Sequence, residues 1–152
     1  MERRVVITGL GAITPIGNDV VKTWKGIEKK KCGIEEITLF DTANFKTKLA
    51  AEVKNYNPLD YFDKKQAKRL DRCSQFAIIA AREAVKNSGI TKENTNYDRV
   101  GVFVSSGIGG LTTIQEQCEI NCMKGNSRVS PMFIPMSVAN MPARKYFDRI
   151  WI

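Results

Sequence analysis

The stretch RRVVITGLGAITPIGN, residues 3–18, sets the fold class of this chain. Its β-branched run at residues 4–8 is typical of a buried strand, and the glycines that follow end that strand. A proline continues the loop, after which Asn18 or Asp19 can cap a helix over residues 20–29. A strand that passes through a glycine turn into a helix is the opening of an α/β unit.

The same order of elements returns later in the chain. Residues 99–105 predict a second buried strand, and the turn SGIGG at 106–110 leads from it into a helix over about residues 111–123. Shorter candidate strands lie at 34–37 and 49–53. The turn at 106–110 could cradle a phosphate, or its glycines could let neighbouring elements pack closely. Together these elements predict an α/β fold with a parallel sheet.

The clearest helical period covers residues 64–88, with Asp63 as the N-cap and Gly89 as the stop. Its small and apolar side chains recur on one stripe, where alanines allow close packing: Leu70, Cys73, Ala77, Ala80, Ala81 and Ala84. Its basic side chains share a second face: Lys65, Lys68, Arg69 and Arg72. Cations near the start of a helix oppose its dipole, so stability alone does not favour them. We therefore predict that this face binds a partner.

Composition indicates a soluble globular protein. The chain has 152 residues, 43% hydrophobic and 26% charged, with a net charge of +8. No apolar run reaches the roughly 20 residues that span a bilayer, so we expect no membrane partner. The short apolar run near Val5 favours a cytoplasmic chain that opens on a strand over one with a signal peptide. The positive charge indicates an anionic partner, either an acidic carrier protein or nucleic acid, or else a merely solvated surface.

The residue types restrict the chemistry that this chain can perform. It has no histidine, so general-base chemistry that needs imidazole cannot come from it alone. Its four cysteines form no CxxC pair, and with no histidine nearby we expect no metal. The first glycine turn has Thr14 where a dinucleotide-binding fingerprint needs its third glycine. We therefore expect no cofactor.

Several segments, taken in order and spacing, resemble the β-ketoacyl-[acyl carrier protein] synthases, most closely the synthase II type of fatty acid synthesis. The segments that carry the resemblance are 3–18, 40–41, 64–71, 106–110, 130–135 and 139–141. The resemblance implies a thiolase-type fold, in which two similar α/β halves stack in layers and two subunits form a homodimer. It also implies the decarboxylative condensation of an acyl thioester with malonyl-acyl carrier protein.

The resemblance assigns roles to two groups of residues. Lys65, Lys68 and Arg69 match the basic helix on which the family docks the acidic acyl carrier protein. Ile108 matches a residue of the acyl-chain pocket, and Phe133 and Ile134 match the segment that reaches the partner subunit's pocket. The family's nucleophilic cysteine would follow Met141, and its two histidines would lie further on. We therefore assign no catalytic residue to this chain.

The resemblance divides the chain into a partial N-terminal synthase domain, residues 1–141, and a tail, residues 142–152, that departs from the family. A shifted reading frame or a truncated gene would produce such a tail, and both explanations stay open. The fold expected is an incomplete N-terminal half of the thiolase-type fold, with apolar faces left exposed and poor solubility or a molten state. We predict that the chain alone is inactive; the alternatives are a non-catalytic module that binds acyl carrier protein and a basic nucleic-acid-binding protein.

Overall fold

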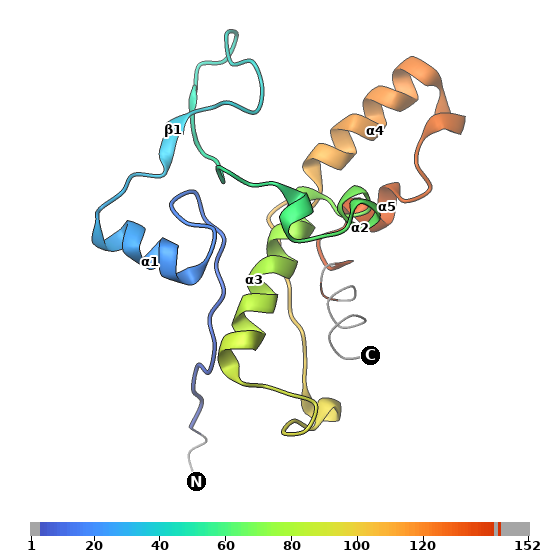
Figure 1. Cartoon of the computed structure of the whole chain (residues 1–152). Coiled ribbons are helices and arrows are strands. Elements are labelled where there is room, and N and C mark those ends of the chain that lie inside the picture. The colour runs from blue at the N-terminus through green and yellow to red at the C-terminus, as the bar shows by residue number, and fades with distance from the viewer. Residues whose placement is uncertain (1–3, 142, 144–152) are drawn as a thin grey trace.

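The computed structural model describes residues 4–141 and 143, arranged around one long helix, α3 (Arg72–Ser88). The N-terminal segment runs along α3, with α1 (Val20–Glu28) and a small hairpin to one side (Figure 1). The short helices α2 (Lys64–Lys68) and α5 (Phe133–Ser137) and the longer α4 (Leu111–Lys124) gather at the N-terminal end of α3. Three short 3₁₀ turns complete the described elements: η1 (Pro58–Asp60), η2 (Tyr97–Arg99) and η3 (Asn126–Arg128).

Local sequence signals place α1 and α4 where the sequence predicts them. The Asp19 carboxylate caps α1 by accepting a hydrogen bond from the backbone N–H of Lys22 at 2.7 Å. Helix α4 begins directly after the glycine turn and ends at Gly125, whose φ of 83° favours glycine. Among the described residues, no helix is long and apolar enough to cross a bilayer.

The prediction of a single helix over 64–88 is wrong, because the helix is interrupted between α2 and α3. Asp63 caps α2, as predicted, but Asp71 then caps α3 through a bond from the backbone N–H of Cys73 at 3.0 Å. The side chain of Gln75 donates to the carbonyls of Ala67 and Leu70, both at 3.0 Å. Carbonyls freed by the break are thus satisfied inside the fold. Gly89, with a φ of 70°, ends α3 as predicted.

The hairpin pairs β1 (Ile34–Glu36) with β2 (Leu49–Ala51) in antiparallel register, Glu35 opposite Ala50. Both short strands lie within the ranges that the sequence predicts. The parallel sheet is wrong for the described residues, since β1 and β2 form the one sheet there. Segments 4–8 and 99–105 form no backbone hydrogen bonds with a neighbouring strand among the described residues. A strand is defined by such bonds.

The N-terminal segment lies on α3 through glycines and the carboxylate of Glu83. A Cβ atom at Gly11 would lie 1.8 Å from the carbonyl oxygen of Ala80, and one at Gly9 would lie 2.1 Å from that of Ala84. The Glu83 carboxylate accepts from the backbone N–H groups of Ala12 and Val20, each at 3.0 Å. The close approach depends on glycines of the N-terminal segment, and the predicted role of the alanine side chains stays a prediction.

The core is small, and much apolar surface is exposed. The buried cluster consists of Phe62, Leu70, Ile78 and Ile79, so the most buried face of α3 is displaced from the predicted stripe. The accessible surface is 11500 Å², against roughly 7,800 Å² for a compact monomer of this mass. Val5 is 91% exposed and Phe103 is 97% exposed. The expectation of exposed apolar faces is confirmed; the expected poor solubility stays a prediction.

Candidate functional site

The buried side chain of Asp71 joins α4 to the N-terminal end of α3. Its Oδ2 accepts from the hydroxyl of Thr113 at 2.6 Å and from the backbone N–H of Thr113 at 3.2 Å, while Oδ1 caps α3. Asp71 is 6% exposed and Thr113 is 5% exposed. Because a buried carboxylate needs such partners, this cluster fixes the start of α4 against α3.

The glycine turn at 106–110 packs against α5. The backbone N–H of Gly110 donates to the carbonyl of Ser137 at 2.9 Å, and a Cβ atom at Gly109 would lie 2.4 Å from that same oxygen. Gly109 also has a φ of 88°, which disfavours larger residues. The interpretation that these glycines serve close packing is confirmed, with α5 as the neighbour rather than a strand.

The three residues predicted for an acyl pocket lie on these two adjoining segments. Ile108 projects from the turn and is 67% exposed, and Ile134 on α5 is 61% exposed. Phe133 is half-buried and lines a cavity of about 330 Å³ between α4 and α5, whose lining does not include the other two. The structure brings the two segments together through the hydrogen bond between Gly110 and Ser137.

The basic face predicted on residues 65–72 is correct for three of its four members. Lys65, Lys68 and Arg69 are exposed at the C-terminal part of α2. Arg72 is not part of this face, because it belongs to α3. Its guanidinium donates to the carbonyl of Val53 at 3.0 Å and lies 4.8 Å from the ring centroid of Phe76. The break in the helix is what turns Arg72 inward.

The helix-dipole argument for binding by this face is also wrong. Lys65 and Lys68 lie in the last turn of the short helix α2, where the dipole favours cations. A structural reason for these lysines therefore exists. The exposure and the positive charge of Lys65, Lys68 and Arg69 still favour a docking surface.

Nearly the whole chain matches the model of a known protein family. The family model "Beta-ketoacyl synthase, N-terminal domain" matches residues 2–145. The chain belongs to the β-ketoacyl synthase family. The predicted fold class is confirmed with it: an α/β chain equivalent to an incomplete N-terminal half of the thiolase-type fold.

Curated members of the β-ketoacyl synthase family share much of this sequence. The chain is 48% identical over 140 residues to 3-oxoacyl-[acyl-carrier-protein] synthase 2 of Staphylococcus aureus strain N315, covering 92% of this chain and 34% of that protein. It is 42% identical over 140 residues to the enzyme of the same name from Synechocystis, with the same two coverages. The chain therefore spans about a third of the length of these relatives.

Solved ketosynthases show the same fold. The ishigamide ketosynthase/chain length factor matches with a TM-score of 0.86 and 26% identity, over 99% of this chain and 38% of that chain. The ketosynthase structure AntDE:AntF, a type II PKS acyl-carrier protein in complex with its ketosynthase, matches with a TM-score of 0.77 and 24% identity, over 97% of this chain and 39% of that chain.

In this member of the synthase family, Cys73 occupies a position that could favour a reactive thiol but lacks the electrostatics for one. It lies in the first turn of α3, where a helix dipole stabilises a thiolate. Burial raises the pKa of the Cys73 thiol, and the neighbouring Asp71 carboxylate raises it further. The other cysteines, Cys32, Cys118 and Cys122, are free and exposed.

We expect iodoacetamide at neutral pH to modify Cys32, Cys118 and Cys122 about tenfold or more faster than Cys73, because the thiolate is the reactive form. Raising the pH should narrow the difference as Cys73 approaches its raised pKa. Peptide mass spectrometry over a time course measures each rate, with the urea-unfolded chain as the control in which all four react alike. A Cys73 that reacts first in the folded chain would contradict this assignment.

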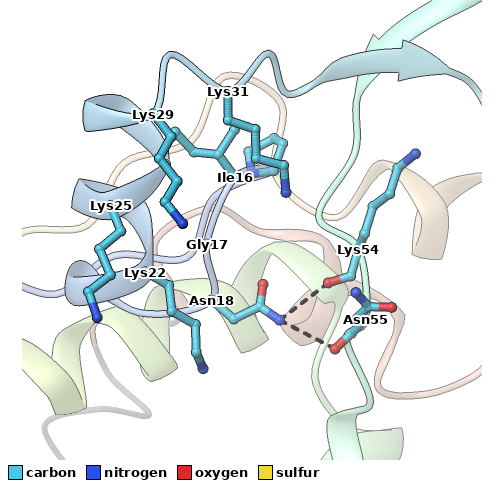
Figure 2. A pocket seen from close by; sticks show the side chains of 11 residues that line it. Ile16, Gly17, Asn18, Lys22, Lys25, Lys29, Lys31, Lys54 and Asn55 are labelled. Atoms are coloured by element: carbon cyan, nitrogen blue, oxygen red, sulfur yellow. Dashed lines mark hydrogen bonds between the residues drawn. The ribbon is translucent and has the colours of Figure 1, made fainter.

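A cationic pocket that the sequence did not lead us to predict lies beside α1 (Figure 2). Five lysines line it: Lys22, Lys25, Lys29, Lys31 and Lys54. The spacing of Lys22, Lys25 and Lys29 puts them on one face of α1, a signal that the sequence contains. Lys31 and Lys54 come from segments that only the fold brings to the same place.

Proposed function

We propose that this chain represents part of a β-ketoacyl-[acyl carrier protein] synthase of fatty acid elongation, which condenses an acyl thioester with malonyl-acyl carrier protein and releases carbon dioxide. The observation that carries the proposal is the 48% identity to a 3-oxoacyl-[acyl-carrier-protein] synthase 2 over 92% of the chain. Residues 1–141 form the partial synthase domain in this proposal. The proposed tail, residues 142–152, lies outside the described residues except for Ala143.

The 152-residue chain by itself is not expected to carry out the condensation. Covalent acyl transfer needs an activated nucleophile, and an enolate intermediate needs donors or cations placed at the developing charge. The chain has no histidine, and burial and the Asp71 carboxylate raise the pKa of the Cys73 thiol, which disfavours its nucleophilic form. Carbon dioxide release from malonyl-acyl carrier protein by the purified chain, dependent on an acyl thioester, would overturn this point.

A docking surface for acyl carrier protein is proposed at Lys65, Lys68 and Arg69. The three side chains are exposed together on α2 and its C-cap, and they carry one sign of charge. A carrier protein with an acidic surface is complementary to them, and such complementarity steers association. The related structure AntDE:AntF pairs an acyl-carrier protein with its ketosynthase.

Charge reversal tests this surface. We expect Lys65→Glu with Lys68→Glu to weaken binding of acyl carrier protein by about tenfold or more, and binding by the parent chain to fall as salt is raised. The matched control is Lys46→Glu with Lys48→Glu, which changes the net charge equally at exposed positions of the hairpin loop. Fluorescence anisotropy of a labelled carrier protein gives both affinities. Equal weakening by the two pairs would reduce the effect to net charge and contradict docking on α2.

A second candidate function is carrier binding without catalysis. It is favoured by one observation: the exposed cationic surface is present in a chain that has no histidine. Binding that depends on Lys65 and Lys68, with no condensation by the same preparation, would support this candidate. The acyl-pocket roles of Ile108, Phe133 and Ile134, and a homodimer of the whole enzyme, remain part of the first proposal.

A further inference from the structure

The lysine pocket, defined by Lys22, Lys25, Lys29, Lys31 and Lys54, is a concave surface of one charge. Its volume is about 340 Å³, and its lining also includes Pro15, Ile16 and Gly26. It lies on α1, the loop that precedes α1, and the segment that follows β2. None of these residues belongs to the surface proposed for the carrier protein.

The lysines are only partly neutralised. Lys22 pairs with Asp19 at 2.9 Å, and Lys54 pairs with Glu35. Lys25, Lys29 and Lys31 form no ion pair among the described residues. In Figure 2 the ammonium groups of Lys29 and Lys31 point into the space between α1 and the segment that carries Lys54 and Asn55. Like charges that converge in this way are repelled unless an anion lies between them.

The field of these lysines reaches the acidic residues at the rim. The hydrogen bond from Lys22 holds the pKa of Asp19 below its usual value, and Lys25 acts in the same direction. The hydrogen bond from Lys54 does the same to the pKa of Glu35, with a further contribution from Lys31. Lys25 and Lys31 thus act on these carboxyl groups in addition to the lysines that pair with them.

The walls of the pocket are held by specific bonds. The Asn18 side-chain amide donates to the carbonyls of Lys54 and Asn55 at 3.2 and 3.3 Å, which ties the loop to the segment after β2 (Figure 2). Lys30 adopts a left-handed φ of 53°, and the backbone N–H of Lys31 donates to the carbonyl of Gly26 at 2.9 Å. This turn at the end of α1 brings the Lys31 side chain back over the pocket.

The helix dipole is a competing explanation for part of the cluster. Lys25 lies in the last turn of α1 and Lys29 is its C-cap residue, positions at which cations are stabilised. Lys31 and Lys54 lie outside the helix, so the dipole does not account for them. The negative end of the dipole also disfavours an anion here, and the ammonium groups must supply the attraction.

We propose that the lysine pocket binds a small ligand with linked phosphate groups. Lysine ammonium groups are general phosphate ligands, and several of them around one cavity fit a compact polyanion. The volume suits a small molecule, and the lysines surround one depression instead of following an extended track, which favours a compact ligand over a nucleic-acid backbone. The inference is independent of the proposed condensation, because it concerns different residues.

Inorganic pyrophosphate is the probe for the test. Isothermal titration of the full chain should show binding that weakens with salt, and Lys29→Glu with Lys31→Glu should weaken it by about tenfold or more. The matched control, Lys46→Glu with Lys48→Glu, makes the same change in net charge and should alter the affinity less than about twofold. A lysine-acetylation footprint read by mass spectrometry should show protection of Lys29 and Lys31 by pyrophosphate.

Three results would overturn the proposal. The first is no measurable binding of pyrophosphate by the parent chain. The second is equal weakening by the two double variants, which would leave only the net charge as the cause. The third is a duplex DNA that protects Lys29 and Lys31 and that pyrophosphate does not displace, which would make the pocket part of a nucleic-acid surface.

Discussion

Replacing Asp71 by alanine should release α4 from α3 and cost on the order of 3 kcal/mol of local stability. The substitution removes the cap of α3 and leaves the buried hydroxyl and N–H of Thr113 without their acceptor. A loss of this size raises the opening equilibrium on the order of a hundredfold, since 1.4 kcal/mol is a factor of ten. Amide hydrogen exchange across residues 111–117 measures the opening without requiring a cooperative melt.

Asp63 supplies a matched control for that experiment. It is also an aspartate N-cap, but it is exposed, and its oxygen accepts from the backbone N–H of Gln66 at 2.7 Å within the same short helix. Asp63→Ala should cost about 1 kcal/mol or less and leave exchange in α4 unchanged. If both variants behave alike, the bonds between Asp71 and Thr113 do not hold α4 in place.

We also expect Gly11→Ala to cause a large loss of stability where the N-terminal segment packs on α3. The added Cβ atom would lie 1.8 Å from the carbonyl oxygen of Ala80 and 2.9 Å from the backbone nitrogen of Ala84. Both atoms belong to the backbone of α3, so no side-chain rotation relieves the overlap. The N-terminal segment must move away from α3, at a cost of about 2–3 kcal/mol.

This movement has local readouts. The segment would lose the bond from the Ala12 N–H to Glu83 at 3.0 Å and the bond from the Asn87 side chain to the carbonyl of Leu10 at 2.9 Å. Faster exchange of the Ala12 amide, followed by NMR, is the expected signature. Gly107→Ala is the control, because a Cβ atom there meets nothing within 4 Å and should change stability by less than about 1 kcal/mol. Unchanged exchange at Ala12 in the Gly11 variant would show that the close approach is not required.

The local signals in the sequence determined several elements of this protein. Asp19, Asp63 and Gly89 mark helix ends correctly because a cap acts within one turn of its own residue. Local residue patterns also mark the two short strands of the hairpin and the start of α4 after its glycine turn. Family membership was also accessible, since the order and spacing of modest motifs are a property of the sequence itself.

Tertiary structure alone decided the features that depend on distant partners. Asp71 begins α3 with a buried side chain, and Thr113, on another helix, supplies two of its hydrogen-bond donors. The interruption between α2 and α3 turns Arg72 toward Val53 and removes it from the basic face. Helical periodicity continues through the interruption of the helix, so the pattern predicted one helix and one basic face.

Segments 4–8 and 99–105 have the residues of strands, but a strand needs a hydrogen-bonded neighbouring strand, and none of the described residues provides one. The lysine pocket likewise exists only where α1 meets the segment of Lys54, because charges distant in sequence combine only when the fold brings them together.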